Sequence, residues 1–64
     1  MTKKELKKLA KEIAGWERII QTTDDPNRKY VAEQTVMNLT NQVDDMEDII
    51  ALDELIMNIL NEKT

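Results

Sequence analysis

Apolar residues recur along this chain at the three- and four-residue spacing of an amphipathic helix. In the first third, steps of three and four residues alternate through Leu6, Leu9, Ile13, Trp16 and Ile20. This spacing places the five side chains on one side of a helix over about residues 2–21. Away from that side, Gly15 together with Ala10 and Ala14 leaves a shallow surface, which is either neutral or a place where another helix approaches closely.

Turn-forming residues at 22–25 separate this segment from the rest of the chain. Asp25 followed by Pro26 has the form of an N-cap with proline at the first helical position. The same spacing then returns in Ala32, Val36, Leu39, Val43, Met46, Ile50, Met57 and Leu60, with Asp53 as the polar member of the series. Because neither Gly nor Pro follows residue 26, the pattern predicts one helix over about 26–62, roughly 55 Å long.

These elements predict an all-α fold in a single domain spanning residues 1–64. We expect an antiparallel helical hairpin with a short first helix and a long second helix, assembling as a dimeric helical bundle. The alternative is a compact three-helix bundle in which the second helix breaks near residues 41–47. In that alternative, Asp44 is the N-cap and Glu47 its capping-box partner.

The last third of the chain is apolar on nearly all sides, since nine of the twelve residues from Ile49 to Leu60 are apolar. Such a segment has to be surrounded by protein, either by a fold-back of the chain or by a second copy. The predicted protein-interaction residues are Ile49, Leu52, Leu55, Ile56, Ile59 and Leu60. Asp53 falls among apolar positions, and we expect it either to face solvent or to fix register or contact a partner.

Chain length favours association. A chain of 64 residues buries a small core and is marginally stable alone. The sequence has neither cysteine nor histidine, which excludes a disulfide framework and an ordinary structural zinc site. Self-association, most simply as a homodimer, is the remaining way for such a short chain to gain stability.

Charge is divided unevenly along the chain. Residues 1–18 hold six basic and three acidic groups, a net charge of +3, while residues 19–64 hold three basic and ten acidic groups, a net charge of −7. If the chain reverses near Asp24, the lysines of the first helix lie alongside Asp44, Asp45, Glu47 and Asp48. Their complementary charge favours an antiparallel arrangement.

Catalytic and ligand-binding chemistry is sparse. The chain has no serine, cysteine or histidine, so hydroxyl-imidazole and thiol-imidazole pairs cannot form, and we expect no enzyme activity. The acidic residues from Asp44 to Asp48 fit a solvated face better than a metal site, and no cofactor is expected. The net charge of −4 and the scarcity of aromatics argue against nucleic acid, and no segment suits a membrane span. Without an export signal, a cytoplasmic location is expected.

One short segment resembles a known family. Residues 52–56, Leu-Asp-Glu-Leu-Ile, are similar to part of the motif of small bacterial helical hairpins that act as aspartyl-phosphate phosphatases. A Ser-Gln pair precedes this stretch in that family, whereas Ile50 and Ala51 precede it here. Phosphatase activity is therefore not carried over to this chain.

The functional hypothesis is a small non-enzymatic regulatory or adaptor protein that acts through helix–helix association, principally with itself. A first alternative is a subunit whose C-terminal helix docks into a groove of a larger partner protein. A second alternative is a small helical DNA-binding regulator, which would bind duplex DNA in a salt-dependent way.

Overall fold

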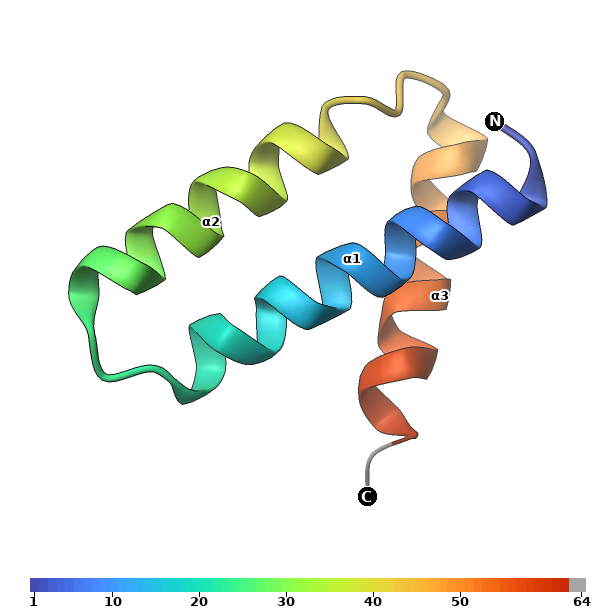
Figure 1. Cartoon of the computed structure of the whole chain (residues 1–64). Coiled ribbons are helices and arrows are strands. Elements are labelled where there is room, and N and C mark those ends of the chain that lie inside the picture. Colours follow the sequence, from blue (N-terminus) through green and yellow to red (C-terminus); the bar gives the residue numbers. More distant parts are fainter. Residues whose placement is uncertain (63–64) are drawn as a thin grey trace.

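A computed structural model describes residues 1–62, and within this range the chain forms three helices and no strand (Figure 1). The helices are α1 (Lys3–Thr22), α2 (Pro26–Thr40) and α3 (Met46–Asn61). The fold is thus all-α, as predicted, but the predicted hairpin with one long second helix is wrong. The three-helix alternative with a break near residues 41–47 is confirmed.

The starts of α1 and α2 follow from their caps. At α1, the Thr2 side chain accepts a hydrogen bond from the Glu5 backbone N–H, and the Glu5 side chain accepts one from the Thr2 backbone N–H. This reciprocal pair is a capping box. At α2, the Asp25 side chain accepts from the Asn27 backbone N–H, and Pro26 takes the first helical position. The sequence predicted this second cap correctly.

The predicted long helix breaks where helix propensity is low. Thr40, Asn41, Val43 and Asp44 are all poorer helix formers than alanine or leucine, and the Thr40 hydroxyl donates to the Val36 carbonyl oxygen. Asp45, one residue later than expected, is the N-cap of α3, with its side chain accepting from the Glu47 N–H. Breaking here lets the chain bury the apolar residues of α3 against its own core, which a straight helix could do only against another chain.

α1 is the central element of the fold. It packs against both α2 and α3, whereas α2 and α3 make little contact with each other. Figure 1 shows α2 running back alongside α1, and α3 crossing α1 after the loop at residues 41–45. The molecule is consequently flat, with extents of 34 × 27 × 15 Å. Its radius of gyration of 11.9 Å exceeds the about 10.7 Å expected for a compact chain of this length.

The hydrophobic core lies along one side of α1 and is small. The buried residues of its main cluster come from α1, from the loop and from α3: Leu6, Leu9, Ala10, Ile13, Val43 and Leu52. Ala14 on α1 and Ala32 on α2 are buried as well. Trp16 and Ile20, which the spacing placed on the same line as Leu6, are half-buried. Ala10 and Ala14 are almost completely buried, with 0% and 1% of their surface exposed, so the close-approach interpretation holds for these two alanines. Gly15 is exposed and does not take part.

Candidate protein interaction surface

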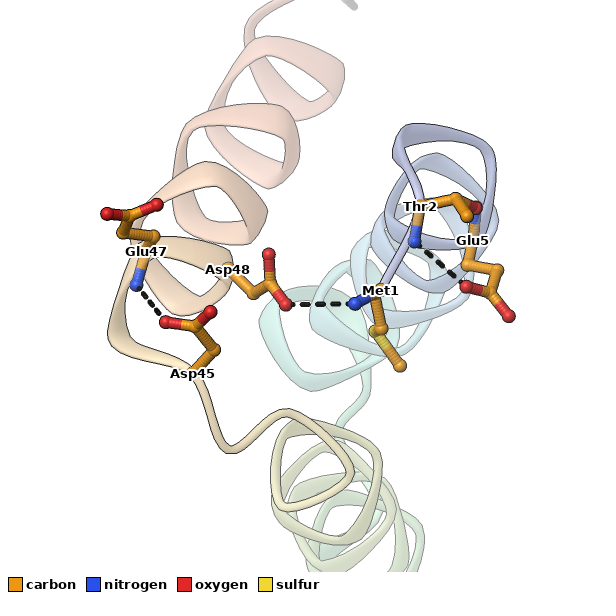
Figure 2. A network of polar contacts seen from close by, with 6 residues as sticks. All are labelled: Met1, Thr2, Glu5, Asp45, Glu47 and Asp48. Atoms are coloured by element: carbon orange, nitrogen blue, oxygen red, sulfur yellow. Dashed lines mark hydrogen bonds and ion pairs between the residues drawn. The ribbon is translucent and has the colours of Figure 1, made fainter.

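Three contacts hold α3 in place on α1. Leu52 on α3 is 1% exposed and lies in the core cluster with Leu6 and Ala10 of α1. Near the other end of α3, the Arg18 guanidinium donates a hydrogen bond of 3.2 Å to the Ile59 carbonyl oxygen. At its start, the Met1 amine lies 3.1 Å from Asp48 Oδ2 (Figure 2). These contacts fix which side of α3 faces the core.

The polar contacts near the start of α3 also shift two pKa values. The hydrogen bond from the Met1 amine to Asp48 raises the pKa of that amine, and the charge of Asp48 acts in the same direction. The hydrogen bonds that Glu5 makes with Thr2 lower the pKa of the Glu5 carboxyl. Both groups are exposed to solvent. The Glu5 contact caps the start of α1, and the Met1 contact joins the start of α1 to the start of α3.

The acidic segment pairs with a different group from the one expected. We predicted that the α1 lysines would lie alongside Asp44, Asp45, Glu47 and Asp48. Within residues 1–62, the ion pair at this segment is made by the Met1 amine with Asp48, and no lysine forms one. The lysines remain in solvent because the face of α1 that carries them points away from the core.

The predicted interaction residues lie mainly against the protein's own core. Leu52 is buried, and four others are partly buried and pack against the core cluster: Ile49, Leu55, Ile56 and Ile59. Leu60 is half-buried at the end of the helix. Their expected contact with a second chain stays a prediction, since much of their surface is already covered by α1 and the loop. Asp53 is exposed in the single chain, and its expected register or partner contact stays a prediction.

The apolar residues that α3 leaves in solvent are Met46, Ile50 and Met57, which are 74%, 55% and 62% exposed. They lie four and seven residues apart and therefore on one side of the helix. Asp53 falls between them at the same spacing. Sequence reasoning placed these three residues in the core because the heptad spacing runs on through the break. The signal that identifies them is the cap at Asp45, which begins a new helix with its own orientation.

α2 carries a second exposed apolar pair, Tyr30 and Met37, seven residues apart and thus on the same side of the helix. The sequence pattern did not select them. Both lie off the line through Ala32, Val36 and Leu39. Ala32 on this line is buried, and Val36 and Leu39 are partly buried against the core.

The described part of the chain offers little for metal or small-molecule chemistry. Within residues 1–62, no group of three or more carboxylates is placed to hold a metal ion. The hollows found are shallow grooves beside α1, lined by lysine stems and by residues of α2 or α3. No helix in the same range has the length and apolar character that crossing a membrane requires.

Comparison of the chain with protein-family models, with curated proteins and with solved structures gives no match.

Proposed function

We propose that this chain is a small non-enzymatic regulatory or adaptor protein that acts by helix–helix association, beginning with association to itself. The observation that carries the proposal is the exposed line of Met46, Ile50 and Met57 on α3. Large apolar side chains aligned in water favour burial, and each contributes roughly 1.5–3 kcal/mol when it is fully covered.

Two further features support the proposal. Only two large side chains within residues 1–62, Ile13 and Leu52, are at most 2% exposed, so the core of one copy is small. Chains of this size usually gain stability from disulfides, metals or association, and this sequence has no cysteine and no histidine. The lack of serine as well leaves no usual nucleophile–imidazole pair, which supports a role in binding rather than catalysis.

The structure also changes which residues test this proposal. Substitution of Leu55 or Ile56 with a charged residue would damage the core against which both pack, so loss of binding could simply reflect unfolding. Ile50 and Met57 are exposed, and a charge at either position leaves the core intact.

The test is sedimentation velocity from low micromolar to submillimolar concentration on the wild type and on Ile50→Asp and Met57→Asp. We expect the wild type to shift from monomer to dimer, and both variants to remain monomeric with unchanged helicity by circular dichroism. Asn58→Asp is the matched control, because it adds the same charge to α3 beside Lys7 and Lys11 rather than on the exposed apolar line. A wild type that stays monomeric throughout would contradict self-association.

A further inference from the structure

The grooves beside α1 define one side of the molecule. The groove between α1 and α3 is lined by Lys3 and Lys7 on α1 and by Ala51 on α3, among others. The groove between α1 and α2 is lined by Lys8 on α1 and Leu39 on α2, among others. The α1 surface between these grooves carries Lys4 and Lys11. We call this the lysine side.

The exposed apolar residues of α2 and α3, apart from Val31 on α2, lie away from the lysine side. At about 100° per residue, Tyr30 and Met37 are about 180° and 160° around α2 from Leu39. By the same measure, Met46 and Met57 are about 140° and 120° around α3 from Ala51. Tyr30 and Met37 therefore face away from the lysine side, and Met46 and Met57 turn obliquely away from it. We call the side of the molecule that carries these four side chains the apolar side. Ile50 lies at its outer edge.

The arrangement of the helices leaves the apolar side without a covering element. α1 runs alongside α2 and crosses α3, and α2 and α3 diverge from the loop at residues 41–45 with little contact between them (Figure 1). Within residues 1–62, no further helix packs against the face away from α1.

The size of this side suits one particular kind of partner. The molecule is 34 Å by 27 Å across, so a rectangle of about 900 Å² encloses its broad side. A standard stable interface buries about 800 Å² on each partner. The three exposed residues of α3 are too few to fill such an interface, but the apolar residues of α2 and α3 together span the broad side.

We propose that the apolar side is covered by a second copy of this chain, in a two-fold dimer in which α2 and α3 of both copies form the interface. The inference rests on the proposed function and adds that α2 takes part equally. A two-fold contact uses the same surface on both copies, so apolar side meets apolar side. It also leaves both lysine sides in water, where five lysines of each α1 keep their hydration.

The first test compares two neighbouring positions on α2 by sedimentation equilibrium. Met37 and Val31 are equally accessible, at 57% and 55% exposed, but they lie about 120° apart around the helix. Met37→Asp should weaken the dimer by at least about tenfold, the loss of one well-buried contact. Val31→Asp introduces the same charge outside the proposed interface and should leave the dimer unchanged.

A second variant tests the interface in the opposite direction. Asp53 lies on α3 between Ile50 and Met57, so its carboxylate loses hydration when the dimer forms. Asp53→Leu should tighten the dimer by about tenfold. Glu12→Leu is the control, since it removes the same charge and adds the same side chain in the groove beside α2 on the lysine side.

The outcomes separate this inference from the proposed function. If Ile50→Asp breaks the dimer while Met37→Asp has no greater effect than Val31→Asp, the proposed place of α2 in the interface is wrong while the proposed function stands. If Asp53→Leu and Glu12→Leu tighten association equally, added hydrophobicity alone is responsible and the inference is likewise overturned. A monomeric wild type contradicts both.

Discussion

Side-chain size decides which residues of α1 are buried. Leu6, Leu9 and Ile13 enter the core as large apolar groups, whereas Ala10 and Ala14 are buried because they are small enough for a neighbouring helix to come close. The hydrophobic spacing identified the large residues correctly. It could not show that the alanines are more buried than Trp16 and Ile20, since the burial of these residues depends on how the neighbouring helices pack on α1.

Gly15 offers a direct test at this scale. A Cβ atom built at this position meets nothing within 4 Å outside its own helix backbone, and glycine inside a helix costs about 1 kcal/mol relative to alanine. Gly15→Ala should therefore raise the free energy of unfolding by about 0.5–1 kcal/mol in urea denaturation, with the dimer dissociation constant unchanged.

The matched control is the preceding residue. Ala14→Gly makes the reverse change at a buried position and should destabilise the fold by at least as much as Gly15→Ala stabilises it. Destabilisation by Gly15→Ala would show that another helix approaches Gly15 closely, which contradicts the placement described for α1.

At the scale of the element, the break between α2 and α3 determines the fold. Both ends of α1 and the start of α2 were predictable from caps and spacing to within one or two residues. The break was open to two interpretations, because the heptad spacing continues through residues 41–45 and records only periodicity. The spacing does not show whether the apolar groups of α3 are covered by α1 or by another chain, because this depends on tertiary packing.

The same ambiguity explains the candidate surface. Taking the helix as continuous assigned Met46, Ile50 and Met57 to the core and Leu52 and Ile56 to a partner. Once α3 begins at its own cap and turns Leu52 toward α1, the assignment largely reverses. The surface could be found only after the orientation of α3 was known.

The cap of α3 gives a prediction at this scale. Asp45→Ala removes the side chain that accepts from the Glu47 N–H and should cost about 0.5–2 kcal/mol in the free energy of unfolding. Asp44→Ala, the position favoured by sequence reasoning, should change it by less than about 0.5 kcal/mol. Chemical denaturation of both variants shows which loses more free energy of unfolding. A larger loss for Asp44→Ala would contradict Asp45 as the N-cap of α3.

For the whole molecule, the fold produces two unlike sides from one chain. α1 packs its apolar side against both neighbouring helices and leaves its lysines in water. α2 and α3 each have more apolar surface than α1 covers. A flat molecule 15 Å thick between Cα positions cannot enclose both sides of its outer helices, and this supports the proposed association.

The return of α3 onto α1 is the claim on which this account depends. The chain has no cysteine, so spin labels can be placed uniquely at Lys11→Cys and Asn58→Cys, two positions that line the same groove. Pulsed electron resonance, with labelled chains diluted in excess wild type, should give a distance below roughly 20 Å, or two helix diameters. In a hairpin turning near residue 24, Lys11 would lie opposite residue 37, and Asn58 would be roughly 31 Å further along the axis. A distance beyond roughly 30 Å would contradict the three-helix fold and the surface derived from it.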